Sequence, residues 1–159
     1  MKNVINRKAD FCFLAALLIL ALSTCKKDVS SGDAWIVGKW SNRFLISRDI
    51  VQQYQFKSND SVEFYAFKID TVTKSIIGYS YRTIGKYKVD GKELTLYGTT
   101  SFLNPANGFG SIAQLVKSSG PTTSMFNFSL NDKKNQLSFY FVCPLNADCI
   151  ASPVIYYKE

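Results

Sequence analysis

The chain has 159 residues, 47% of them hydrophobic and 19% charged, which is an ordinary composition for a globular protein. Its formal charge is +7, but the cations are scattered and no glycine-rich aromatic motif accompanies them, which argues against nucleic acid as a partner. Histidine is absent, which removes the commonest general base, the serine and cysteine triads, and most metal chemistry. The remaining carboxylates stand in or beside predicted turns, where solvation explains them: Asp60, Glu63, Asp70, Asp90 and Glu93. We therefore expect no enzyme, no metal site and no cofactor.

Residues 1–24 have the organisation of an export signal. Cations at Lys2, Arg7 and Lys8 precede an apolar run over residues 11–22. Twelve residues would rise only ~18 Å as a helix, short of the ~30 Å hydrocarbon core, so this segment is predicted to be a signal peptide and no membrane span. The sequence Leu-Ser-Thr-Cys at residues 22–25 then resembles a bacterial lipobox.

The lipobox resemblance implies cleavage before Cys25, a diacylglyceryl group on its thiol and an acyl chain such as palmitate on its new amine. Several acyl chains together make a stable membrane anchor. The alternative is an ordinary secretory signal in which Cys25 is incidental. Removal of three cations and one carboxylate with the signal lowers the charge from +7 to +5.

Residues 25–34 comprise the lipidated cysteine and a polar, aperiodic stretch, predicted to be a flexible tether with a reach of about 15–18 Å. Lys26 and Lys27 would favour anionic head groups beside the anchor. By resemblance to sorted lipoproteins, lysine rather than aspartate after the cysteine favours the outer membrane, on its periplasmic face or at the cell surface.

Residues 35–159 alternate apolar and polar positions with a period of two, the pattern of β-strands. Polar or glycine-containing turns separate the strands at Ser58-Asn59-Asp60-Ser61, at Asp90-Gly91 and over residues 131–135. The expected strands cover residues 40–46, 53–57, 62–66, 76–82, 85–89, 94–96, 126–130, 137–141 and 154–157. The pattern predicts one all-β domain, an up-and-down antiparallel barrel of about eight strands that leaves no exposed edges, with a β-sandwich as the alternative.

The first strand opens with Gly38-Lys39-Trp40, and this motif resembles the start of the lipocalin-like proteins. Together with the later hairpins, the resemblance covers roughly residues 36–142. It implies a barrel with Trp40 buried at a closed end, near residues 139–141 of the late strands. No arginine follows Arg82, so the late-strand arginine that stacks on this tryptophan in the family has no match in the sequence.

Residues 99–123 interrupt the strand pattern with several glycines and prolines and one apolar cluster over residues 112–116. Loops this long are uncommon in compact domains and are often functional. The cluster is either a lid over the barrel mouth or part of a surface excursion that contains one irregular strand or helical turn.

Cys143 and Cys149 are the pair left after Cys12 leaves with the signal and Cys25 is lipidated. In an exported protein, such a pair most simply forms a structural disulfide, which would add roughly 2 kcal/mol of stability. The rival is a metal site or a redox pair, but two thiolates make only half a zinc site and reactive dithiols prefer two intervening residues.

Two functions remain open for the predicted barrel. The first is binding of a small apolar ligand by inward aromatic residues: Tyr54, Phe56, Phe64, Tyr87, Phe128, Phe139 and Phe141. In that case Phe64 and Phe128 would face an open cavity. The second is a structural or interaction lipoprotein whose barrel is filled by the same residues and which acts through its surface loops. A cavity of about 300 Å³ or more would favour the ligand.

Overall fold

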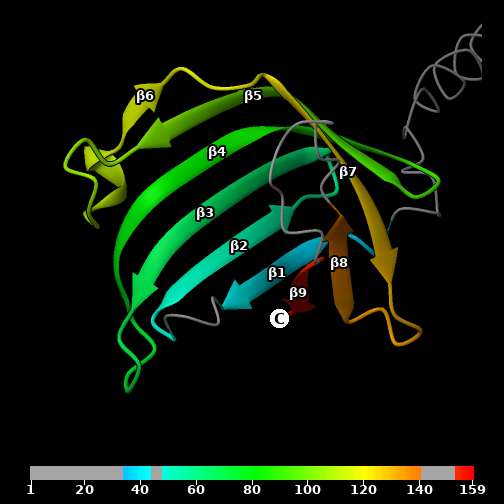
Figure 1. Ribbon diagram of the computed structural model, residues 1–159, viewed down its shortest axis with the longest axis horizontal. Coiled ribbons are helices and arrows are strands. Elements are labelled where there is room, and N and C mark those ends of the chain that lie inside the picture. Colours follow the sequence, from blue (N-terminus) through cyan, green and yellow to red (C-terminus); the bar gives the residue numbers. More distant parts are fainter. Residues whose placement is uncertain (1–33, 44–47, 141–152) are drawn as a thin grey trace, which may run out of the picture. The chain divides into compact units, whose positions relative to one another are not determined.

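The computed structural model describes residues 34–43, 48–140 and 153–159, and these residues form nine antiparallel strands and one 3₁₀ turn (Figure 1). The turn, η1, covers Ile112–Gln114. The strands are β1 (Gly38–Arg43), β2 (Ile50–Phe56), β3 (Ser61–Ile69), β4 (Ile76–Asp90), β5 (Glu93–Leu103), β6 (Val116–Ser118), β7 (Thr123–Leu130), β8 (Gln136–Tyr140) and β9 (Val154–Lys158). Gly32–Glu159 form one compact unit.

Eight of the strands close into a barrel, because β1 pairs with β2 on one side and with β9 on the other. The circuit continues through β3, β4, β5, β7 and β8, each antiparallel to its neighbours. The predicted up-and-down barrel is confirmed, and the alternative of a β-sandwich is wrong. Figure 1 shows β2 to β5 as a long curved band, while β8 and β9 are short.

Strand β4 corrects the sequence prediction, which placed separate strands over residues 76–82 and 85–89. The chain runs unbroken from Ile76 to Asp90. Three register shifts interrupt its pairing: Ile77 and Ser80 are extra residues opposite β3, and Gly98 and Thr99 of β5 together oppose Gly85. A side chain at Gly85 would meet the Thr99 methyl group at 2.8 Å, so glycine permits this close approach.

The predicted turns lie where polar residues interrupt the alternation. Strand β3 begins at Ser61 after Asp60 adopts a φ of 59°, and residues 131–135 join β7 to β8. The β4–β5 turn is displaced by one residue from the prediction, because Asp90 pairs with Glu93 and the two loop residues are Gly91 and Lys92. Only the first of these has positive φ, 59° at Gly91.

One end of the barrel is plugged by the turn that precedes β1. Trp40 and Ile36 are both fully buried, and the Trp40 indole Nε1 donates a hydrogen bond of 2.7 Å to the Ile36 carbonyl. Trp40 belongs to the same core cluster as Phe139, in agreement with the prediction of a buried tryptophan among late-strand residues. Phe44 and Ile46, also expected on the first strand, lie outside the described residues.

A lysine from the last strand covers the tryptophan. Lys158 Nζ lies 5.2 Å from the centre of the Trp40 ring and donates a hydrogen bond of 2.9 Å to the Trp35 carbonyl. Lys158 occupies the position over the tryptophan where lipocalin-like proteins have an arginine, and a single lysine carries no local pattern that would have indicated this. The cation therefore ties the last strand to the plug.

The barrel interior is filled mainly by aromatic and aliphatic side chains. Tyr54 lies at the centre of the aromatic set, with ring centres 4.6 Å from Phe64 and 5.2 Å from Tyr156. A second, smaller cluster of Val51, Phe67 and Ile69 lies on the opposite face of the β2–β3 sheet, since these residues alternate with the inward ones. Strands β2 and β3 therefore contribute to an apolar cluster on each face of the sheet.

Candidate ligand cavity

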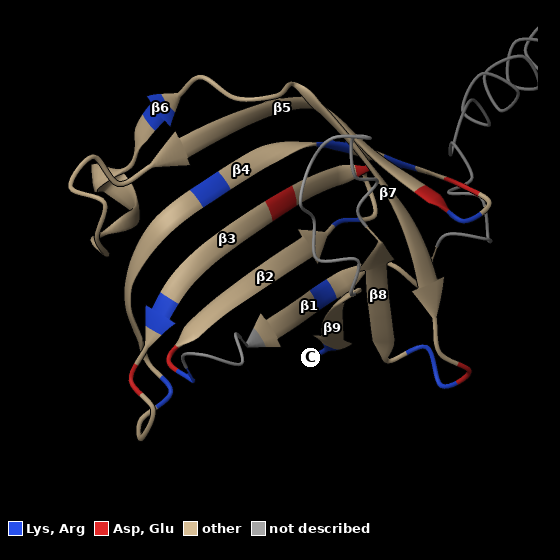
Figure 2. Cartoon of the chain, viewed as in Figure 1, with Lys and Arg blue, Asp and Glu red and all other residues tan. Residues whose placement is uncertain are grey.

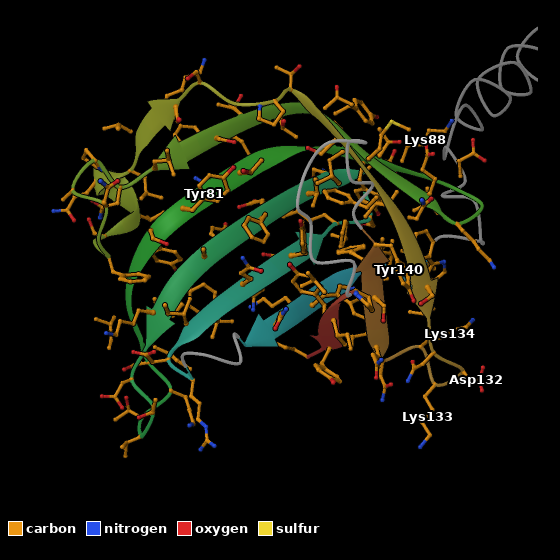
Figure 3. All side chains as sticks on the ribbon, in the orientation of Figure 1. Tyr81, Lys88, Asp132, Lys133, Lys134 and Tyr140 are labelled. Atoms are coloured by element: carbon orange, nitrogen blue, oxygen red, sulfur yellow. The ribbon has the colours of Figure 1, made fainter. Side chains whose placement is uncertain are left out.

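A cavity of about 140 Å³ remains inside the barrel, away from the plugged end. The lining residues come from β2, β3, β4, β5 and β7 and from the segment before β7: Tyr54, Phe64, Tyr81, Thr83, Leu96, Thr99, Ser101, Pro121, Ser124 and Phe126. Figure 3 shows Tyr81 on β4, toward the end of the sheet that carries β6 and away from Lys88.

The cavity exists because side-chain size falls along one row of paired residues. Trp40 pairs with Tyr54, Tyr54 with Phe64, Phe64 with Thr83 and Thr83 with Ser101. Neighbours in such a row project from the same face of the sheet. The residues of this row on β1, β2 and β3 therefore carry large rings, whereas those on β4 and β5 carry small hydroxyl groups. The space that the small side chains leave unfilled is the cavity.

One wall of the cavity is a hydrogen-bonded set of hydroxyl groups. Ser101, only 7% exposed, has its Oγ 2.9 Å from the Tyr81 hydroxyl and 3.1 Å from Thr83 Oγ1. Hydroxyl groups can both donate and accept hydrogen bonds. No charged side chain belongs to the described lining, so this wall suits an uncharged polar group and no isolated ion.

The facing wall is apolar, with Phe64, Leu96 and Phe126 as its main surfaces. Tyr54 also borders the cavity, and burial, reinforced by the nearby Tyr81, raises the pKa of its phenol well above the ordinary value. The Tyr54 phenol is therefore neutral at physiological pH and offers no nucleophile. The cavity can hold a small molecule, and the described residues around it offer no acid–base pair.

The structure divides the predicted ligand residues into two groups. Tyr54 and Phe64 line the cavity. Four others fill the core beyond it: Phe56, Tyr87, Phe128 and Phe139. Phe128, expected to face an open cavity, instead stacks near the plug, with its ring 5.1 Å from that of Trp35. Phe141, Cys25, Cys143 and Cys149 lie outside the described residues, so lipidation and the disulfide stay predictions.

The sequence reasoning missed the hydroxyl wall. Thr83 and Ser101 are polar residues at inward positions, and the sequence yielded no prediction for either. Thr83 follows the plain alternation of β4 from inward Tyr87, whereas the bulge at Gly98-Thr99 turns Ser101 to the same face as Leu94 and Leu96. No signal in the local sequence reveals this bulge.

The predicted loop over residues 99–123 is shorter in the structure, because residues 99–103 continue β5 and Thr123 begins β7. The segment between these strands contains η1 and β6, so the surface excursion describes it better than a lid. Ile112 and Val116 of its apolar cluster are 42% and 52% exposed and do not line the cavity. Thr99 and Pro121, at the base of the excursion, do line it, and Thr99 Oγ1 donates a hydrogen bond of 2.7 Å to the Pro121 carbonyl.

Glu63 is the centre of a charged network on the outer face of β3. It accepts hydrogen bonds from Lys57, Tyr65 and Arg82, the last at 3.0 Å. Burial alone would raise the pKa of Glu63, but these hydrogen bonds and the charge of Lys57 outweigh it and lower the pKa to about 2. Two of the three donors to the Glu63 carboxylate are cations and the third is a phenol, so the carboxylate stays ionised and forms a structural ion pair.

Within the described part of the chain, no three His, Cys, Asp or Glu side chains are grouped closely enough to hold a metal ion. Across the same residues, no helix is long and apolar enough to cross a membrane. Comparison of the chain with protein families, with characterised proteins and with solved structures gives no match in any of the three.

Proposed function

We propose that this chain is a lipid-anchored cell-envelope protein whose lipocalin-like barrel binds a small, neutral, amphipathic ligand. The proposal of ligand binding rests on the cavity, which has hydroxyl groups on one wall and aromatic rings on the other. The lipobox at residues 22–25 supports the anchor. A buried first-strand tryptophan covered by a late-strand cation supports the lipocalin-like assignment.

The size of the cavity limits the ligand. A dry cavity of about 150 Å³ in another protein binds benzene, so about 140 Å³ holds one ring or a short acyl segment. Drug-sized ligands need pockets of about 300 Å³ or more. A larger ligand would place only one end in the cavity. That end would carry a hydroxyl or carbonyl group, which Ser101 or Tyr81 could pair with.

A fluorescence titration with 2-naphthol, a small neutral aromatic alcohol, tests the proposal. Saturable binding is expected, and Ser124→Leu, which fills the cavity, should weaken it by at least about tenfold, or about 1.4 kcal/mol. Met125→Leu is the matched control, because this neighbouring side chain on β7 is 55% exposed and lies outside the lining. Equal affinity in both variants, or no saturable binding to the unmodified protein, would reject the cavity as the site.

The second candidate function is a filled barrel that acts through its surface loops, and the modest size of the cavity favours it. Truncation of Phe64 separates the two functions, because this ring lines the cavity. If the unmodified barrel binds the probe, Phe64→Ala should weaken binding. If the barrel is filled, Phe64→Ala should create binding where there was none and lower stability by about 3–5 kcal/mol.

A further inference from the structure

Aliphatic and aromatic side chains stand exposed on two segments at the end of the barrel opposite the plug, which we call the rim loops: the β3–β4 turn with the start of β4, and the segment after β5 that contains η1 and the start of β6. We name this set of side chains the apolar rim; it comprises Val72, Ile76, Ile77, Phe109, Ile112 and Val116. Val72, at the tip of the β3–β4 turn, is 86% exposed, and Ile77 is 58% exposed. Single exposed aliphatic residues are ordinary on protein surfaces, but six on two neighbouring loops indicate a contact surface.

The two loops that carry the rim are joined by backbone contacts. Tyr79 N–H donates to the Gly110 carbonyl at 2.7 Å, and Gly110 N–H donates to the Tyr79 carbonyl at 3.0 Å. Gly78 is in direct contact with this segment, since a Cβ there would lie 2.8 Å from Gly110 N. The start of β4, which carries Ile76 and Ile77, is therefore tied through Gly78 and Tyr79 to the backbone of Phe109 and Gly110.

The rim loops satisfy their own backbone polar groups. In the β3–β4 turn, the Asp70 carboxylate accepts hydrogen bonds from Val72 N–H and Thr73 N–H, each at 2.8 Å, and Lys74 N–H donates to the Asp70 carbonyl. In the second loop, Gln114 Oε1 accepts from Ser111 N–H, and Gln114 N–H returns a bond to the Ser111 carbonyl. Such loops can enter a medium of low polarity without leaving these donors unpaired.

Charge is absent from one of the two rim loops, and beside the other the Lys68–Asp49 ion pair is internally balanced. Residues 94–116 contain no charged side chain, and the next residue is Lys117 on β6. Figure 2 shows this region in the neutral colour, with Lys117 marked on β6. Lys74 lies in the β3–β4 turn, and the one acid there, Asp70, is held by the turn's own amides, which lower its pKa. Two lysines thus flank the exposed apolar residues.

We propose that the apolar rim docks on a lipid bilayer, with its apolar side chains in the interfacial layer and Lys74 and Lys117 at anionic head groups. Protruding loops with exposed apolar tips and basic flanks suit a bilayer, which accepts a convex surface. A partner adding a strand would need free backbone donors, and the β3–β4 turn binds those of Val72, Thr73 and Lys74 internally. The proposal rests on neither the cavity nor the N-terminal anchor.

Vesicle flotation tests the rim on residues 25–159 with Cys25→Ala, which removes the acyl chains. This segment contains all of the compact unit Gly32–Glu159 and every strand of the closed barrel, so it retains the fold. Binding to phosphatidylcholine vesicles that contain phosphatidylglycerol is expected. The double variant I77S/F109S should reduce the vesicle partition coefficient by at least about tenfold, because two large apolar side chains are lost from the interface.

Matched control variants test whether vesicle binding depends on the apolar rim or on exposed apolar residues elsewhere. M125S/Y157S removes two side chains of similar exposure, 55% and 56%, from β7 and β9 and should leave the partition coefficient unchanged. K74Q/K117Q should weaken binding to the anionic vesicles several-fold and leave binding to pure phosphatidylcholine unchanged. Circular dichroism of each variant confirms that the barrel is intact.

Three results would overturn the proposal. The first is no flotation of the unmodified domain with anionic vesicles. The second is an equal loss for I77S/F109S and M125S/Y157S. The third is self-association in solution, without vesicles, that I77S/F109S abolishes; this would assign the rim to a second copy of the chain. Val72→Trp adds a direct readout, since insertion into the bilayer should shift the emission of the new side chain to the blue and allow quenching by brominated lipid.

Discussion

At the scale of single residues, Lys158 joins the last strand to the plug by two contacts of its side chain. The ammonium group lies over the Trp40 ring and binds the Trp35 carbonyl. Trp40 in turn is fixed by its bond to the Ile36 carbonyl. The first and last strands of the barrel are therefore held by one lysine and one indole, in addition to their short backbone ladder.

Replacement of Lys158 by methionine should lower the free energy of unfolding by about 1 kcal/mol, because the cation–π contact and the bond to Trp35 are lost. Urea denaturation followed by tryptophan fluorescence measures the change. Lys39→Met on β1 is the control and should stay within about 0.5 kcal/mol, since this lysine is exposed. If both substitutions changed the free energy of unfolding equally, the contact of Lys158 with Trp40 would not stabilise the fold.

The lowered pKa of Glu63 predicts that the free energy of unfolding depends on pH. The folded-state pKa of about 2 lies below the ordinary 4.5, so the stabilisation is complete above about pH 4.5 and is lost as the pH falls toward 2. Glu63→Gln should lose about 2 kcal/mol at neutral pH and should lack this acid-dependent loss. Thermal unfolding at several pH values measures both effects.

The exposed ion pair of Lys88 and Asp90 provides the comparison for Glu63. Its side chains are 69% and 78% exposed and their charged atoms lie 3.5 Å apart. Asp90→Asn should change stability by less than about 0.5 kcal/mol at neutral pH. A Glu63→Gln variant that behaved the same way would show that the Lys57, Tyr65 and Arg82 network does not stabilise the barrel.

At the scale of elements, the contact between β4 and the loop after β5 depends on the absence of a side chain at Gly78. A Cβ there would lie 2.8 Å from Gly110 N and 3.0 Å from the Phe109 carbonyl carbon, both backbone atoms. Since backbone cannot yield as a side-chain tip does, the loop would have to move away from β4.

Gly78→Ala should therefore cost about 1–3 kcal/mol and speed hydrogen exchange of the Gly110 and Tyr79 amides. Gly108→Ala is the matched control in the same loop, because the nearest atom to a Cβ there is 3.9 Å away. Slow exchange retained in Gly78→Ala would show that the loop accommodates the methyl group without losing its bonds to β4.

At the scale of the whole molecule, the barrel is filled at one end and hollow toward the other. The plug, with Ile36 and Trp40, closes the end where the chain enters β1. The cavity and the apolar rim lie toward the opposite end. Residues 34–37 lead into β1 at the plugged end, so this segment and the exposed rim are at opposite ends of the barrel.

Cys25→Ala should release the full-length protein from the membrane fraction, because the substitution removes the proposed site of acylation. Fractionation with a high-salt wash measures this, and Cys12→Ala, within the signal, is the control. The apolar rim could retain a small part of the variant, which I77S/F109S would then remove. A Cys25→Ala protein that resists salt extraction even with I77S/F109S would contradict the lipoprotein assignment.

Local patterns predicted most of the strands and turns, and the resemblance of Gly38-Lys39-Trp40 to a lipocalin-like first strand implied the buried tryptophan. Alternation of apolar and polar residues is a local property, and so is the preference of Asn, Asp and Gly for turns. Tyr54 and Phe64 could be recognised as inward in this way, and both line the cavity. Barrel closure was also predictable, because a closed sheet leaves no exposed edge.

The continuity of β4, the hydroxyl wall and the role of Lys158 depend on contacts between distant parts of the chain. The bulge at Gly98-Thr99 sets the face that Ser101 occupies beside Thr83, and it depends on the pairing of β5 with β4. Lys158 meets Trp40 across 118 residues of chain, through the register of β1 with β9. Such contacts arise from long-range pairing, which no local period in the sequence encodes.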